Sequence, residues 1–109
     1  NQSLLATGCY EHEDPGITRM GKQVIGEMNR VGMVVDMSHS AERSTLEAIE
    51  ISERPIAITH ANPSFWHPAL RNKSEQVLKE LSQKWGDAWI LNVSSSSQRQ
   101  IGMHPGKFL

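Results

Sequence analysis

The sequence predicts an α/β fold with parallel strands, because short apolar segments alternate with amphipathic helical segments three times along its 109 residues. The segments expected to form strands are 33–37, 56–59 and 89–93. They are almost wholly apolar, which is typical of strands covered on both faces by helices. Parallel strands need right-handed crossovers, so we expect three βα units.

The three helical segments carry signals for where they start and stop. Thr18 is expected to cap the first helix, which Gly32 ends. Ser40 is expected to cap the second, and Ser74 the third, with Gly86 at its end. By their spacing, the residues expected in the core are Val24, Ile25, Met28, Val31, Met33, Leu46, Ile49, Val77, Leu78, Leu81 and Trp85.

Composition excludes several classes of function. The net charge is -1 and 21% of residues are charged, with acids and bases interspersed, so no nucleic-acid partner is expected. No apolar run reaches the roughly 18 residues that a membrane span needs. Cys9 is the only cysteine, which excludes an intrachain disulfide and a cysteine-based zinc finger. The cellular compartment is left undetermined.

Three strands are too few to close a barrel, and they leave unpaired sheet edges. The sequence also begins with Asn1 and ends at Leu109 within a polar region, without separate domains or repeats. We therefore expect a fragment whose sheet is completed by the rest of a larger protein or, alternatively, by another chain.

Two histidines follow the first two predicted strands. His39 comes two residues after Met37, and His60 directly follows Thr59. In parallel α/β folds the carboxyl ends of the strands lie at one rim, where chemistry is usually found. Neutral imidazole is a preferred zinc ligand, so the pair predicts two ligands of a zinc ion. The alternative is that each ring only bonds a loop carbonyl.

Two further residues are candidates at the same rim. Asp36 can orient a ligating histidine by accepting its second N–H, or alternatively cap a helix or pair with a base. Arg71 can clamp a substrate carboxylate through two parallel hydrogen bonds, although most loop arginines are simply solvated. The serines at 94–97 lack a Gly-x-Ser-x-Gly elbow. The catalytic residue itself stays unknown.

The sequence resembles the renal, or membrane, dipeptidase family of zinc peptidases from about residue 8 to about residue 93. The matching segments are 16–18, 27–33, 36–39, 59–60 and 71–72. The spacings from His39 to His60 and from His60 to Arg71 also match those of the family. The tetrapeptide at 6–9, Ala-Thr-Gly-Cys, departs from the Gly-x-Gly-Cys that the family often has there.

The resemblance implies a (β/α)8 TIM-like barrel that holds two zinc ions. Residues 1–109 would then be a fragment of this single metallo-dipeptidase domain. The resemblance also implies that His39 and His60 bind the same metal and that Arg71 holds the C-terminal carboxylate of a dipeptide substrate. The implied reaction is attack of a metal-bridging hydroxide on the peptide carbonyl, because zinc lowers the pKa of its water and polarises the carbonyl.

The rest of the family's machinery has no counterpart in this sequence. The His-x-Asp pair that opens the family's barrel, the glutamate that bridges the metals, a substrate-contacting histidine and a late acidic residue all belong to strands outside residues 1–109. The chain alone is therefore expected to be inactive. Two alternatives stay open. One is a related metal-dependent amidohydrolase that acts on a cyclic amide or ester, and the other is a metal-free α/β binding module with structural histidines.

Overall fold

The computed structural model describes residues 3–61 and 72–86 of the chain. Its elements, in chain order, are α1 (Arg19–Val31), β1 (Val35–Asp36), α2 (Glu42–Ile51), β2 (Ile56–Ala57) and α3 (Glu75–Trp85). The predicted alternation of helix and strand is confirmed across this part of the chain. The third predicted strand, at 89–93, lies outside the described residues.

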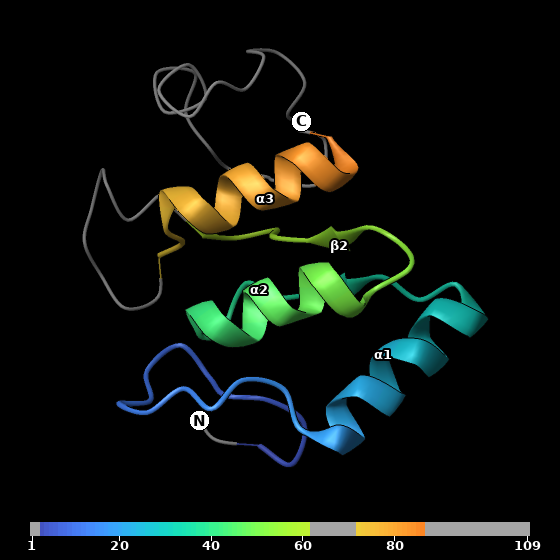
Figure 1. The fold of residues 1–109 in the computed structure, drawn as a ribbon, viewed down its shortest axis with the longest axis horizontal. Coiled ribbons are helices and arrows are strands. Elements are labelled where there is room, and N and C mark those ends of the chain that lie inside the picture. The colour runs from blue at the N-terminus through green and yellow to red at the C-terminus, as the bar shows by residue number, and fades with distance from the viewer. Residues whose placement is uncertain (1–2, 62–71, 87–109) are drawn as a thin grey trace.

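The two strands pair in parallel, as the sequence predicted. Val35 lies opposite Ile56 and Asp36 opposite Ala57, and the Met37 N–H continues the ladder to the Ala57 carbonyl at 2.9 Å. In Figure 1, α2 and α3 lie side by side over this sheet, while α1 packs at an angle beside α2. The chain therefore forms a mixed α/β layer whose two strands end at the same edge.

Most of the predicted helix ends are confirmed. The Thr18 side chain accepts a hydrogen bond from the Gly21 N–H at the start of α1. Gly32 ends α1 in the left-handed conformation, at φ 78°, which glycine adopts without steric cost. The Ser74 side chain accepts from the Val77 N–H at the start of α3, which Gly86 ends.

The predicted cap of α2 is wrong. The N-cap residue is Ala41, not Ser40, and Ala41 has no polar side-chain atom to accept a bond. Ser40 instead pairs with Gly8 in an isolated antiparallel bridge. The first turn of α2 is held from another part of the chain, because Asp14 accepts hydrogen bonds from the Arg43 N–H at 2.6 Å and from the hydroxyl of Ser44 at 3.2 Å.

The core lies between the sheet and the helices. The predicted core residues that are buried there are Ile25, Ile49, Val77, Leu78 and Leu81, and Met28, Leu46 and Trp85 pack against them partly buried. The prediction of a core position is wrong for Val31, at the end of α1, and for Met33, which are 54% and 58% exposed. The Met33 N–H bonds to the Met28 carbonyl at 2.8 Å, so Met33 belongs to the turn that ends α1 rather than to the strand.

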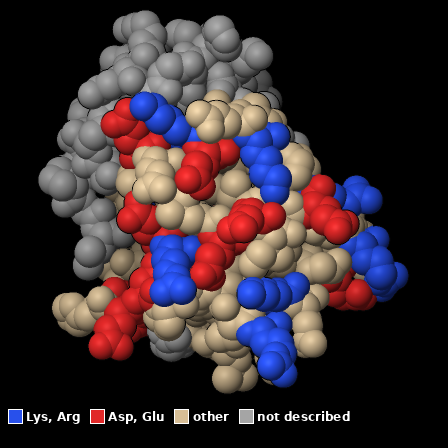
Figure 2. All heavy atoms as spheres, viewed as in Figure 1, with Lys and Arg blue, Asp and Glu red and all other residues tan. Residues whose placement is uncertain are grey.

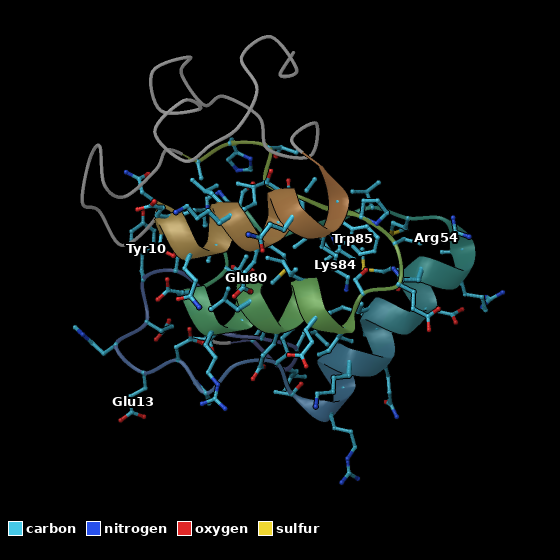
Figure 3. All side chains as sticks on the ribbon, turned by 45° about the horizontal axis from the view of Figure 1, so that its top comes forward. Tyr10, Glu13, Arg54, Glu80, Lys84 and Trp85 are labelled. Carbon is cyan, nitrogen blue, oxygen red and sulfur yellow. The ribbon has the colours of Figure 1, made fainter. Side chains whose placement is uncertain are left out.

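A lysine from α3 holds the C-terminal end of α2. The Lys84 ammonium donates to the carbonyls of Ile49 at 2.5 Å and Ser52 at 3.2 Å, and it lies 4.7 Å from the ring centre of Trp85 (Figure 3). A cation at this end of a helix satisfies carbonyls that have no partner within the helix. The contact ties α2 to α3.

Acidic and basic side chains are interspersed over α2 and α3 on the face shown in Figure 2. This mixture agrees with the near-neutral net charge of the sequence. Among the residues that the structure describes, every helix is too short or too polar to cross a bilayer.

The segment before α1 folds back over the start of that helix. The Thr18 N–H donates to the Leu5 carbonyl at 3.0 Å, and the Thr18 hydroxyl donates to the Leu4 carbonyl at 2.6 Å. Gly21 faces the same backbone so closely that an added Cβ would collide with the Leu5 carbonyl oxygen and lie 2.6 Å from Ile17 Cγ2. Only glycine fits at this crossing without displacing the segment.

Two glycines of α1 give a matched test of this packing. Gly21→Ala should lower the free energy of unfolding by about 1–3 kcal/mol, because the methyl group displaces the backbone at Leu5. Gly26→Ala should raise it by about 0.5–1 kcal/mol, because nothing lies within 4 Å of a Cβ there and alanine favours the helix. Urea unfolding of the full natural chain, followed by circular dichroism, measures both. Equal effects at the two positions would contradict the crossing.

Candidate metal site at the strand ends

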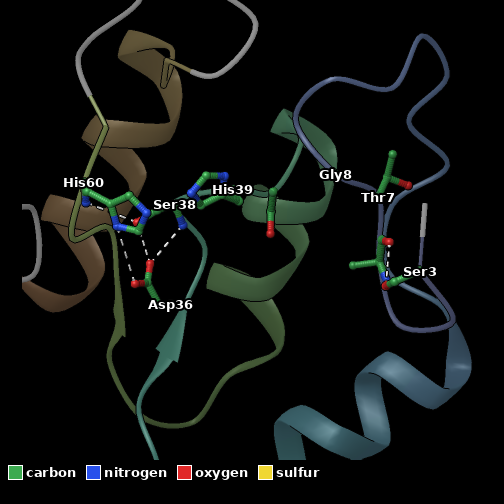
Figure 4. A pocket seen from close by; sticks show the side chains of 9 residues that line it. Ser3, Thr7, Gly8, Asp36, Ser38, His39 and His60 are labelled. Carbon is green, nitrogen blue, oxygen red and sulfur yellow. Dashed lines mark hydrogen bonds and ion pairs between the residues drawn. The ribbon is translucent and has the colours of Figure 1, made fainter. Parts of the chain in front are cut away.

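The two predicted ligands lie next to each other. His39 follows β1 and His60 follows β2, and the centres of their rings are 4.8 Å apart with the planes inclined by 55° (Figure 4). Parallel pairing produces this arrangement, because both strands end at one edge of the sheet. The expected meeting of the two imidazoles at one rim is confirmed.

Ser38 joins the two strand ends. Its hydroxyl donates to Asp36 Oδ1 at 2.5 Å and accepts from the backbone N–H groups of Thr59 at 2.9 Å and His60 at 3.2 Å. Ser38 is 1% exposed, so these partners replace water almost completely. The sequence alone assigns no role to Ser38. Its position between an acid and a histidine at a strand end was the only signal in the sequence.

Asp36 serves the second histidine rather than the one that follows it in sequence. Its Oδ2 accepts from the Thr59 hydroxyl at 2.6 Å and lies 4.0 Å from His60 Nδ1. Burial raises the pKa of Asp36, but the hydrogen bonds from Ser38 and Thr59 outweigh it and hold the pKa below its usual value. Asp36 is therefore an ionised carboxylate beside His60 at neutral pH.

The segment before α1 forms the facing wall of the site. The Cys9 N–H donates to the His39 carbonyl at 2.9 Å, and the Ala41 N–H donates to the Thr7 carbonyl at 2.9 Å. These bonds flank the bridge between Gly8 and Ser40. They fix the loop that carries His39 against a segment that the sequence showed only as irregular.

A cavity of about 310 Å³ lies between this wall and the strand ends. Figure 4 shows Ser3 and Thr7 across from the two histidines and Asp36. The residues that line it are Ser3, Ala6, Thr7, Gly8, Asp36, Ser38, His39, Ser40 and His60. The tetrapeptide that departs from the family pattern, at 6–9, thus contributes three of the lining residues.

The donor atoms fit part of a zinc site. Within residues 3–61 and 72–86, no group of three or more His, Cys, Asp or Glu side chains is placed to hold a metal ion. Two adjacent imidazoles are nevertheless the ligands that zinc prefers, and they amount to half of a four-coordinate shell. Arg71, the predicted substrate-binding residue, lies outside the described residues.

A family model described as membrane dipeptidase, peptidase family M19, matches residues 2–96. The chain belongs to this family. A curated relative, the dipeptidase tcpJ of Claviceps purpurea (strain 20.1), is 35% identical over 71 residues, which cover 65% of this chain and 17% of that protein. The chain therefore spans about a sixth of the length of this relative.

Solved structures of other proteins are similar to this chain. An amidohydrolase from Pseudomonas aeruginosa superposes with a TM-score of 0.76 at 37% identity, over 83% of this chain and 27% of that one. A metallo peptidase from Rhodobacter sphaeroides, liganded with a phosphinate mimic of the dipeptide L-Ala-D-Ala, superposes with a TM-score of 0.65 at 25% identity, over 80% of this chain and 24% of that one.

Two serines of the cavity test whether Ser38 joins the strand ends, because Ser38 bonds both of them and Ser40 only lines the cavity. Ser38→Ala should lower the free energy of unfolding by about 1–3 kcal/mol, because two backbone N–H groups lose their acceptor. Ser40→Ala should change it by less than about 0.5 kcal/mol, because the Ser40 hydroxyl makes only a 3.6 Å contact with the Met37 sulfur. Denaturant titration of both variants measures the difference. If both lose the same stability, Ser38 does not join the strand ends.

Proposed function

We propose that residues 1–109 are part of the (β/α)8 barrel domain of a zinc-dependent dipeptidase, which hydrolyses dipeptides with metal-activated water. One observation carries the proposal: His39 and His60 lie side by side at the ends of two paired parallel strands, in a chain of the membrane dipeptidase family. Ends of parallel strands are where barrel enzymes carry their chemistry.

In this proposal His39 and His60 hold one of two zinc ions, and other strands of the barrel supply the remaining ligands. A bound zinc ion would lower the pKa of its water and polarise the substrate carbonyl. The chain's own residues orient the ligands. Ser38 holds the backbone at His60, and the bond from Cys9 holds the carbonyl of His39.

The cavity and the relatives support a small peptide as the substrate. Its volume of about 310 Å³ lies at the lower end of what ligand sites usually have, and polar and apolar surface contribute about equally to its lining. The related Rhodobacter sphaeroides enzyme holds a mimic of a dipeptide. In our proposal Arg71 binds the C-terminal carboxylate of such a dipeptide through two parallel hydrogen bonds.

One solved structure favours a second candidate. The Pseudomonas aeruginosa protein that is 37% identical to this chain over the aligned region is described as an amidohydrolase. The same histidine pair would serve a metal-dependent hydrolase of a cyclic amide or ester, because the metal polarises any of these carbonyls. Activity of the full natural chain on a lactone or a ring amide, but on no dipeptide, would favour this candidate.

The metal assignment is tested with the histidines. In the full natural chain, His39→Ala and His60→Ala should each reduce zinc content after dialysis and lower dipeptidase activity by more than about 100-fold, because each removes a ligand. Zinc is measured by atomic absorption and activity with a panel of L,L- and L,D-dipeptides.

The matched control is His12→Ala. His12 is exposed in the segment before α1 and does not line the cavity, so its removal should leave zinc content and activity unchanged. Zinc retained at the wild-type level in both His39→Ala and His60→Ala would leave the metal-free binding module as the better interpretation.

The role of Arg71 is tested by comparing a dipeptide with the same dipeptide carrying a C-terminal amide. Arg71→Lys keeps the charge but loses the two parallel bonds, so kcat/KM for a dipeptide should fall by about 10–100-fold. The corresponding dipeptide amide lacks the carboxylate and should be cleaved equally by wild type and variant. Arg43→Lys, on the outer face of α2 beside Glu47, is the control and should behave as wild type. Equal losses on both substrates would argue against a carboxylate clamp.

A further inference from the structure

Thr59 lies between the carboxylate and the second histidine. Its hydroxyl oxygen is 2.6 Å from Asp36 Oδ2 and 2.8 Å from His60 Nδ1. The direct separation of Asp36 Oδ2 and His60 Nδ1 is 4.0 Å, which is too long for a hydrogen bond. The Thr59 hydroxyl therefore connects Asp36 and His60, whose side chains are too far apart to bond directly.

The direction of both bonds follows from counting protons. An ionised carboxylate can only accept, so the single proton of the Thr59 hydroxyl is donated to Asp36. The same oxygen must then accept from His60, which requires the proton of the imidazole to be on Nδ1. The order of donation is His60 to Thr59 to Asp36.

Ser38 cannot reverse this order. Its hydroxyl lies 3.4 Å from that of Thr59, but its own proton is donated to Asp36 Oδ1 at 2.5 Å. Ser38 instead accepts the backbone N–H groups of Thr59 and His60, which fixes the peptide from which both side chains project. The backbone and the hydroxyl thus restrain His60 together.

A neutral imidazole with its proton on Nδ1 carries its lone pair on Nε2. We propose that Thr59 is a positioning residue, which links His60 to Asp36 through its hydroxyl. This link fixes the proton of the imidazole on Nδ1 and leaves Nε2 as the atom that binds the metal. This inference rests on the proposed zinc site. It adds that the histidine is oriented by a carboxylate acting through a hydroxyl, where direct contact with a carboxylate, carbonyl or water is usual.

The tautomer is measured without any metal. In the metal-free full natural chain, the ¹⁵N chemical shifts of the His60 ring, assigned by difference with His60→Gln, should show the proton of the neutral imidazole on Nδ1. Thr59→Ser keeps the hydroxyl and should preserve this tautomer. Thr59→Val has nearly the same shape without the hydroxyl, and should give a mixture of both tautomers.

Zinc affinity provides the second measurement. Titration of Zn²⁺ against a chelating indicator should show affinity reduced by about 10–100-fold in Thr59→Val, the usual effect of losing a group that orients a ligand. Thr59→Ser should restore it to near the wild-type value. His12→Ala, which removes an exposed imidazole outside the cavity, is the control and should bind Zn²⁺ as the wild type does.

Each outcome separates this inference from the proposed function. A wild-type His60 protonated on Nε2, or a Thr59→Val variant with unchanged tautomer and unchanged Zn²⁺ affinity, overturns the role of Thr59. If the tautomer changes as expected but neither His39→Ala nor His60→Ala affects zinc content, the hydroxyl orients His60 and the zinc proposal fails. Should Thr59→Val not fold, as judged by circular dichroism, Thr59→Ala is measured in the same way.

Discussion

The parallel pairing of β1 with β2 is the constraint on which the site depends. With Val35 opposite Ile56 and Asp36 opposite Ala57, the residues that follow each strand emerge at one edge at the same height. A slip of one residue would turn every side chain of one strand to the other face. The helices stabilise this register by burying the strands, and the two histidines meet as a consequence.

The polar contacts at this edge fix the backbone of the strand ends, and through the backbone they position the two histidines. The one hydroxyl of Ser38 forms hydrogen bonds with three polar groups, namely one carboxylate oxygen and two N–H groups. Ser38 itself is buried, so water does not compete for these bonds. Such groups are costly to bury unless each has a partner. The network therefore favours a single arrangement of the strand ends, and a rigid arrangement is what a metal site requires.

The segment before α1 has a structural role that irregular segments often lack. It crosses α1 at Gly21, caps α2 through Asp14 and pairs with the loop that carries His39. Residues distant in sequence thus fix both the helix and the loop on either side of the cavity.

The sequence by itself determined the helices, the two strands, the caps at Thr18 and Ser74, and the histidine pair, because periodicity, capping and strand-end position are local properties. Tertiary structure decided the rest. The capping of α2 by Asp14 and the bridging hydroxyl of Thr59 depend on groups far apart in the chain, which no local pattern brings together.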